Sequence, residues 1–475
     1  MDDSSKNKLL KDFFDSILCY LSQSRKKFQE VKPKTSLKKL ENDFSLENKS
    51  SPKELKVLIK KYLSNSVKTG NPQFYNQLFS GFSVYGFMGE IISAATNTSM
   101  YTFEMSPVAT VMEKQLTKKM SDLIGYPNGG GTFVTGGSSG NMLAMLAARH
   151  FFEPTTMTDG LFNSSRMIAY ISEDAHYSMI KAANQIGVGT NNVIKIPIDK
   201  NGAMIVKKLK NAIERSLSNG DFPFFVGATS GTTVKGGFDP LQEIGSICNY
   251  FKIWFHVDGS WGGGALFSNM HKTLLAGSKL SDSFSWCAHK MLGVPLTCTA
   301  AIFKRPSILS EINQVDEAEY LFHDVENNLL DLGTTSLQCA RRVDVIKLWF
   351  AWKYFGDEGY EKNIDRLFKL AEYASKRVIS SKQLKLMNRV EFLNVCFQVQ
   401  PKGIPESEYN KMTLKARNLM IKNGGPMVNY AYIDSNLVIR LIIVNFDLME
   451  SHLDQFFERL ELSIKTLTSK KNNNF

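Results

Sequence analysis

Two residues near the ends of predicted strands have the types and spacing for chemistry on a bound carbonyl compound. Asp258 follows the apolar run Lys252–Val257 and precedes a glycine cluster. Lys290 lies 32 residues later, just after a second strand predicted over Ser283–Cys287. In an open parallel sheet, ligands bind beyond the carboxyl ends of the strands, so both side chains are predicted to reach one site. A lysine amine in that position suits Schiff-base formation.

Together the two residues fit pyridoxal 5'-phosphate (PLP). The lysine would hold the aldehyde as an imine, and the aspartate would keep the pyridine nitrogen protonated so that the ring accepts electrons. Taken singly, Asp258 could cap a helix and Lys290 could be a solvated lysine. The spacing, the glycines and the two strand ends together favour PLP. An aminotransferase or carbon–sulfur lyase on the same fold, or a non-catalytic basic binding protein, are the alternatives.

The motif HVDGSWGG, followed by HK, resembles the group II PLP-dependent amino-acid decarboxylases, whose usual forms are HVDAAWGG and NPHK. The segments CARRVDVIKLW and EFLNVCFQV extend the resemblance, which covers about residues 70–465 and points to the branch acting on acidic amino acids. It implies an α/β fold of the PLP-dependent transferase type (aspartate aminotransferase-like, fold type I), with a mostly parallel central sheet and a small α+β C-terminal domain. The chain departs from the family at Gly259, Ser260, Cys287 and Ala288. Cys287 replaces an asparagine that helps to hold the phosphate, and a thiol is a poor hydrogen-bonding partner.

The resemblance also implies roles for individual residues. The implied cofactor contacts are Gly137, Ser138, Ser139, His176, Thr229, Asp258, Ser260, His289 and Lys290. In this set the loop GGTFVTGGSSGN would cradle the phosphate at a helix N-terminus, and His176 would stack on the ring. The implied catalytic residues are Lys290, Asp258, His176 and Tyr320, the last on a long aperiodic segment that suits a lid. From the residues alone, His176 and Thr229 would be structural.

Four residues are expected to bind the substrate: Gln77, Phe79, Tyr101 and Arg440. Arg440 lies among aliphatic residues, where a charge needs a partner; the resemblance implies a substrate carboxylate, and a structural salt bridge is the alternative. The segments NQLFSG and NTSMY resemble the cysteine sulfinate and aspartate branch, whereas animal glutamate decarboxylases have NQLSTG and NTNxF. Cysteine sulfinate (to hypotaurine) or aspartate (to β-alanine) is therefore the expected substrate, with glutamate (to GABA) as the alternative. Phe79 and Tyr101 could instead simply pack the domain.

The order of predicted elements divides the 475 residues into three segments. Residues 1–70 form a basic helical segment, and residues 31–53 within it are expected to be a linker. Residues 71–340 form the PLP-binding large domain, because short strands alternate with helices there. Residues 341–475 form the small domain. An apolar stripe on the first helix, comprising Leu10, Phe14, Ile17 and Leu21, is expected to face a second subunit, since the resemblance implies a homodimer.

The composition of the chain limits which classes of binding partner and which cellular compartment are expected. Residues 1–70 hold 16 Lys and Arg against 9 Asp and Glu, so they carry most of the net charge of +11. They contain no interleaved aromatic residues and no RNA-binding motif, so no nucleic acid is expected. The six cysteines form no CxxC pair, so no metal is expected. The start lacks a signal-peptide core, and the most apolar stretch, Leu437–Val444, is too short to span a bilayer. No membrane association and a cytoplasmic location are expected.

Overall fold

The computed structural model describes residues 2–26, 30–162, 164–313 and 330–472, which fall into two compact units. The larger unit comprises residues 82–369 and 388–394, and the smaller one comprises residues 1–81, 370–387 and 395–475. Segments distant in the chain thus join in one unit. The division into 1–70, 71–340 and 341–475 follows chain order instead, and it stays a prediction.

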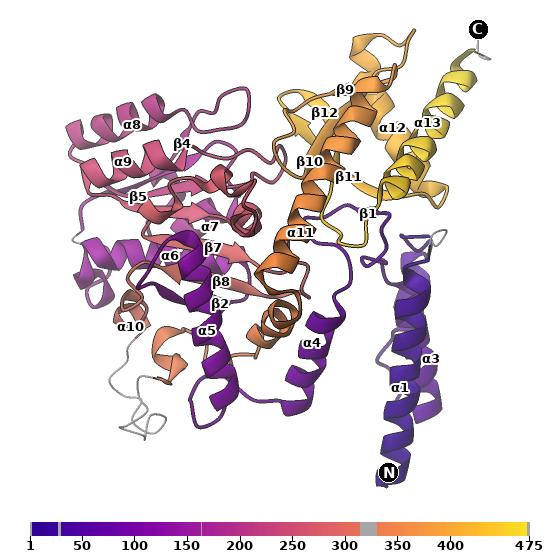
Figure 1. Ribbon diagram of the computed structural model, residues 1–475, viewed down its shortest axis with the longest axis horizontal. Coiled ribbons are helices and arrows are strands. Elements are labelled where there is room, and N and C mark those ends of the chain that lie inside the picture. The colour runs from indigo at the N-terminus through magenta and orange to yellow at the C-terminus, as the bar shows by residue number, and fades with distance from the viewer. Residues whose placement is uncertain (1, 27–29, 163, 314–329, 473–475) are drawn as a thin grey trace. The chain divides into compact units, whose positions relative to one another are not determined.

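In the larger unit, seven strands of the described residues form one sheet, in the order β2-β8-β7-β6-β5-β3-β4 (Figure 1). Their bounds are β2 Gly130–Val134, β3 Met167–Ser172, β4 Val193–Ile196, β5 Phe222–Thr229, β6 Trp254–Asp258, β7 Ser283–Cys287 and β8 Thr299–Phe303. The strands β4, β3, β5, β6 and β7 are mutually parallel, and β8 is antiparallel to both of its neighbours. This arrangement confirms the predicted α/β class with a mostly parallel sheet.

Helices pack against both faces of this sheet. They are α5 Pro107–Ile124, α6 Gly137–Phe152, α7 Ser178–Gln185, α8 Val206–Ser218 and α9 Leu241–Phe251. The larger unit also contains α4 Val84–Thr96 and α10 Ile308–Asn313. In β3, Met167, Ala169 and Ile171 pack into the cluster that includes α6 and α7, while the Tyr170 hydroxyl faces Ser216 of α8. This is the alternation that a strand buried on both faces requires.

The two ends of α5 show how local sequence signals determine where a helix begins and ends. Pro107 occupies its first turn, and Gly125 ends it with φ of +97°. Proline suits a first turn because its missing N–H would be unpaired there, and glycine accepts the left-handed cap at little cost. Together these signals predict a helix from about Pro107 to Ile124, which is the observed span.

The smaller unit contains a five-stranded sheet within the described residues, in the order β1-β11-β12-β10-β9. Its strands are β1 Phe74–Tyr75, β9 Leu384–Leu386, β10 Asn394–Val399, β11 Met427–Ile433 and β12 Asn436–Ile442, and its helices are α1 Asp3–Ser24, α2 Leu37–Asp43, α3 Pro52–Asn65, α12 Tyr409–Lys422 and α13 Glu450–Asn472. α11 (Val345–Ser380) begins in the larger unit and breaks at Gly356, whose φ and ψ are not helical. The expectation of a linker over residues 31–53 was wrong in part, since α2 lies within it, capped by Ser36. Among the described residues, no helix combines the length and hydropathy of a bilayer-spanning segment.

Candidate active site

Three parallel strands end side by side at one edge of the larger sheet. Thr229, Asp258 and Cys287 are the last residues of β5, β6 and β7. Thr229 pairs with Asp258 in register, and Asp258 pairs with Ser285 of the next strand. Lys290 follows three residues after β7, so the sheet brings the predicted aspartate and lysine to the same edge.

Asp258 is a buried carboxylate held by hydrogen bonds to both of its oxygens. Asn141 Nδ2 donates to Oδ2 at 2.8 Å, and the Ser260 main-chain N–H donates to Oδ1 at 3.1 Å. Burial alone would raise the pKa of this carboxyl. The Lys290 charge, the hydrogen bonds from Ser260 and Asn141, and His256 together outweigh burial and hold the pKa below its usual value. Asp258 is therefore a fixed negative charge inside the protein.

His176 lies just beyond β3, half-buried. Its Nδ1 is 2.8 Å from Ser178 Oγ, and the Ser178 main-chain N–H donates to the same atom at 3.3 Å. Burial lowers the pKa of His176, against the opposing charge of Asp258. The ring is therefore neutral near pH 7, with Nδ1 accepting.

Lys290 is partly buried, and its amino group makes no hydrogen bond or ion pair with any residue that the structure describes. Its charge lowers the pKa of Asp258, Cys287 and His176. A lysine amine that is close to a buried carboxylate yet engaged by no neighbour can react with an aldehyde.

The glycine loop between β2 and α6 leaves a helix N-terminus open. Gly136 precedes α6 with φ of +148°, no side chain caps the helix, and a Cβ at Gly136 would meet nothing within 4 Å. Ser138 is exposed, and Ser139 Oγ pairs with Thr135 Oγ1 at 2.9 Å. A Cβ added at Gly137 would lie 2.4 Å from Ser260 Oγ. Uncapped N–H groups in open space are what an anion requires.

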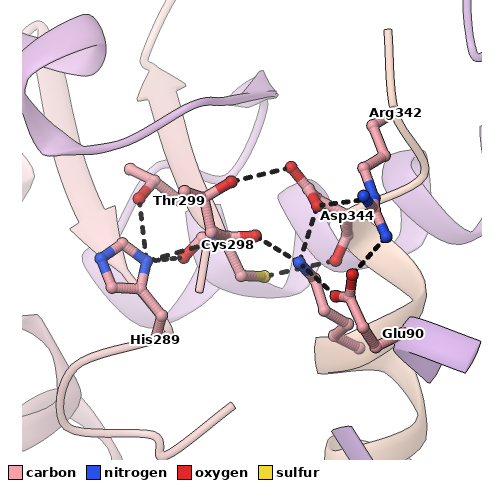
Figure 2. A network of polar contacts seen from close by, with 8 residues as sticks. Glu90, His289, Cys298, Thr299, Arg342 and Asp344 are labelled. Atoms are coloured by element: carbon pink, nitrogen blue, oxygen red, sulfur yellow. Dashed lines mark hydrogen bonds and ion pairs between the residues drawn. The ribbon is translucent and has the colours of Figure 1, made fainter. Parts of the chain in front are cut away.

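Cys287 and His289 lie beside this loop. A Cβ at Gly137 would also lie 3.1 Å from Cys287 Sγ. Thr299 Oγ1 donates to that sulfur at 3.2 Å. His289 Nδ1 contacts the main-chain oxygen of Cys298 at 2.9 Å (Figure 2). Burial would raise the pKa of the Cys287 thiol, but the Lys290 charge, a His289 hydrogen bond and charge, and Thr299 lower it to about 6. The family asparagine position is thus occupied by a group that ionises near neutral pH.

The expected substrate-binding residues fall in both units. Arg440 of β12 is buried, and its Nη2 donates to the main-chain oxygen of Asn76 at 3.0 Å. That contact joins Arg440 to the segment carrying Gln77 and Phe79, both partly buried. Tyr101 belongs to the larger unit, where its main-chain oxygen accepts from Gly333. Tyr320 lies outside the described residues.

Comparison with known proteins agrees with this geometry. The conserved domain of pyridoxal-dependent decarboxylases matches residues 33–400. The chain belongs to this family. The acidic amino acid decarboxylase GADL1 of Xenopus tropicalis is 36% identical over 480 residues, covering 97% of this chain and 93% of the relative. The Homo sapiens protein of that name is 37% identical over 429 residues, covering 88% of this chain and 82% of that protein. The crystal structure of mouse CSAD in apo form is 34% identical and superposes with a TM-score of 0.93, covering 97% of this chain and 99% of that one.

The residues of this pyridoxal-dependent decarboxylase fit PLP. Thr229 Oγ1 and Ser260 Oγ are buried at the strand edge without a hydrogen-bond partner among the described residues. Buried hydroxyls are rarely left unpaired, so these two suit contacts to a bound molecule. The open N-terminus of α6 suits its phosphate, and the buried carboxylate suits its ring nitrogen. The individual contacts predicted from sequence remain predictions.

Three further polar residues adjoin the site, and sequence reasoning missed their roles: Asn141, Ser178 and His256. Each lies within a motif that was noticed, but nothing in a single sequence shows that these motifs meet. The one available signal was position, because Asn141 falls one helical turn after Gly137.

Proposed function

We propose that this PLP-dependent decarboxylase acts on small acidic amino acids and prefers cysteine sulfinate or aspartate to glutamate. The observation that carries the proposal is the buried guanidinium of Arg440, bonded to the main chain next to Gln77. A buried cation beside a polar segment suits a substrate acid group, which an Arg side chain can bind in bidentate fashion. The two relatives named acidic amino acid decarboxylases support the same substrate class.

In this proposal each residue of the site has one task. PLP, when bound, supplies the electron sink that accepts the electrons left behind as the α-carboxylate departs as CO₂. Lys290 would bind the cofactor aldehyde, and Asp258 would hold a proton at the ring nitrogen. His176 would orient the ring by stacking. Tyr320 would return a proton to the substrate Cα, with the segment around it excluding water.

Size is the basis for the preference between acids. Phe79 stands where the animal glutamate decarboxylases have serine, and its ring lies 6.3 Å from that of Phe74. Glutamate is one methylene longer than aspartate, and the phenyl ring fills space that a longer side chain would need. One methylene changes discrimination by about 1–3 kcal/mol, or roughly 10–200-fold. Some glutamate turnover is therefore expected.

Steady-state kcat/KM on cysteine sulfinate, aspartate and glutamate tests the preference. Phe79→Ser should raise the ratio for glutamate over aspartate by roughly 10-fold or more, because it restores space for one methylene. Phe82→Ser, which removes a phenyl ring from a neighbouring, partly buried position, should leave the ratio unchanged. A wild-type enzyme that prefers glutamate would contradict the proposal and favour a glutamate decarboxylase.

We also propose a homodimer in the cytoplasm that binds neither nucleic acid nor membrane. Exposed apolar side chains on the two long N-terminal helices support the dimer. They are Leu10, Phe14 and Leu18 on α1, and Leu55, Val57 and Tyr62 on α3. Contiguous exposed apolar surface is typical of interaction sites.

A further inference from the structure

Asn141 of α6 is a buried amide that contacts Asp258, Ser178 and His256, although the motif that contains it gives it no role of its own. It is 1% exposed. Its Nδ2 donates to Asp258 Oδ2 at 2.8 Å and to Ser178 Oγ at 3.0 Å. Its Oδ1 lies 3.1 Å from His256 Nε2. Both N–H bonds of the amide are thus used, one on the Asp258 carboxylate and one on the Ser178 hydroxyl that contacts His176.

A chain of hydrogen bonds with one direction sets the orientation of this amide. Trp254 Nε1 can only donate, and it lies 2.9 Å from Ser283 Oγ. Ser283 Oγ can accept that bond and still donate its own proton to His256 Nδ1, also at 2.9 Å. Burial lowers the pKa of His256, so the ring is neutral. The Asp258 carboxylate can only accept, so Asn141 Nδ2 faces it and Asn141 Oδ1 faces His256, which places the single ring proton on Nε2. That proton is donated to Asn141 Oδ1, which directs the NH₂ group toward Asp258.

The second N–H bond of Asn141 continues to His176. Because Ser178 Oγ accepts from Asn141, its hydroxyl proton is free to be donated to His176 Nδ1 at 2.8 Å. The Ser178 main-chain N–H reinforces that contact. His176 is therefore held with Nδ1 as the acceptor. One amide thus organises the carboxylate and the imidazole together.

We propose that Asn141 is a positioning residue that holds Asp258 ionised and oriented toward the cofactor ring nitrogen and, through Ser178, fixes the imidazole of His176. This inference rests on the role proposed for Asp258. A carboxylate that accepts N–H donors at both oxygens is stabilised in its charged form. Losing one of two donors in a buried site leaves that oxygen unpaired, and no water-exposed alternative replaces it.

The test uses the holoenzyme reconstituted with PLP labelled with ¹⁵N in the ring, because the ¹⁵N chemical shift reports whether the ring nitrogen is protonated. In Asn141→Leu, the protonated fraction at a given pH should fall, and PLP affinity should weaken roughly 5- to 150-fold, the loss expected when one buried group becomes unpaired. Asp258→Asn removes the carboxylate and should leave the ring nitrogen unprotonated, so it provides the ¹⁵N chemical shift of a neutral ring. Asn394→Leu is the matched control, since Asn394 is an equally buried asparagine of the same unit that bonds Trp261 instead. It should lower thermal stability and leave the ¹⁵N shift at the wild-type value.

A wild-type ¹⁵N shift in Asn141→Leu, with a neutral ring in Asp258→Asn, would overturn the role of Asn141 and leave that of Asp258 standing. A protonated ring in Asp258→Asn would overturn both. If Asn141→Leu does not fold, Asn141→Ala is measured in the same way, because alanine favours the helix and also lacks the amide donors.

Discussion

At the scale of single residues, the site consists of titratable groups. Burial and neighbouring charges determine which of these groups are ionised. Asp258 stays ionised although it is buried, because Lys290 and two hydrogen bonds offset the cost of desolvation. His176 is neutral for the opposite reason, since burial dominates its environment. Perturbed groups that cluster at strand ends are typical of functional sites.

Lys290→Ala should fold normally yet fail to bind PLP covalently, because it removes the amine beside Asp258 that is proposed to bind the cofactor aldehyde. The visible absorbance of lysine-linked PLP should disappear, and decarboxylation should fall by several orders of magnitude. Borohydride reduction followed by peptide mapping measures the linkage directly. Lys304→Ala, which alters an exposed lysine bonded to the main chain of Lys279, should keep both properties. Labelling of another lysine in the wild-type protein would refute the assignment.

Cys287→Asn should tighten PLP binding. It should also remove the part of the pH dependence of PLP affinity that comes from the Cys287 thiol. The pKa of the Cys287 thiol is lowered from 9.0 to about 6, so the thiolate fraction rises as the pH rises through about 6. A thiolate beside the open end of α6 repels phosphate, so the PLP affinity of the wild-type apoprotein should fall as the pH rises from about 5 to about 8.

Fluorescence titration of the apoprotein with PLP at several pH values measures this effect. The asparagine variant should bind about tenfold more tightly near neutral pH, because it donates a charge-assisted hydrogen bond and carries no charge itself. Cys248→Ser is the control, since burial raises the pKa of that thiol and it is neutral throughout. If the PLP affinity of the wild type and of Cys287→Asn changed equally with pH, the Cys287 thiolate would have no effect on phosphate binding.

At the scale of elements, a buried ion pair supports the strand that leads into the glycine loop before α6. Glu113 of α5 and Arg341 are 0% and 3% exposed, and they pair directly. The Phe133 N–H of β2 donates to Glu113 at 3.2 Å, and Arg341 donates to the Phe133 carbonyl at 3.2 Å. The pair thus joins α5 to the strand that leads into Gly136 and Gly137.

Glu113→Gln should destabilise the protein by about 3–5 kcal/mol, because it leaves the Arg341 charge buried without its counter-charge. The free energy of unfolding in urea measures this loss. Asp357→Asn removes one partner of an exposed pair with Lys119 and should cost about 0–1 kcal/mol. Similar losses in the two variants would mean that the buried pair contributes no more than an exposed one.

At the scale of the whole molecule, charge and apolar surface are distributed unevenly along the chain. The first 70 residues carry most of the net positive charge. Their helix α1 also exposes Leu10 and Leu18, which are 55% and 61% exposed. A helix that exposes such residues in water gains from burying them against a partner.

The doubly substituted variant Leu10→Lys, Phe14→Lys should shift the enzyme toward monomer, because each charge would be buried at the proposed subunit boundary. Light scattering at the working concentration measures the mass, which should approach twice 53.4 kDa for wild type and 53.4 kDa for the variant. Lys6→Glu, Lys8→Glu alters the same helix on charged residues and should leave the mass unchanged. A fully active wild-type protein of 53.4 kDa would exclude the dimer.

Local signals in the sequence were sufficient to predict several helices and strands. They were also sufficient to identify Asp258 and Lys290 as the residues expected to carry the chemistry. The span of α5 follows from a proline and a glycine, and those of β3 and β7 follow from short apolar runs. Asp258 was recognised because it directly follows such a run, and Lys290 because it lies three residues after another. Where the local signal was weak the prediction failed: α2 was taken for a linker, and β11 and α12 were not foreseen.

Only the tertiary structure decided how the polar groups meet. Asn141 lies 117 residues from Asp258 and 115 from His256, yet it bonds both. Arg440 reaches the main chain of a residue 364 positions earlier. Periodicity and propensity depend on near neighbours in the chain, so they determine which segments become strands and helices. The strand order and the crossings of the chain determine which segments adjoin. Partners more than a hundred residues apart therefore become apparent only when the sheet has formed.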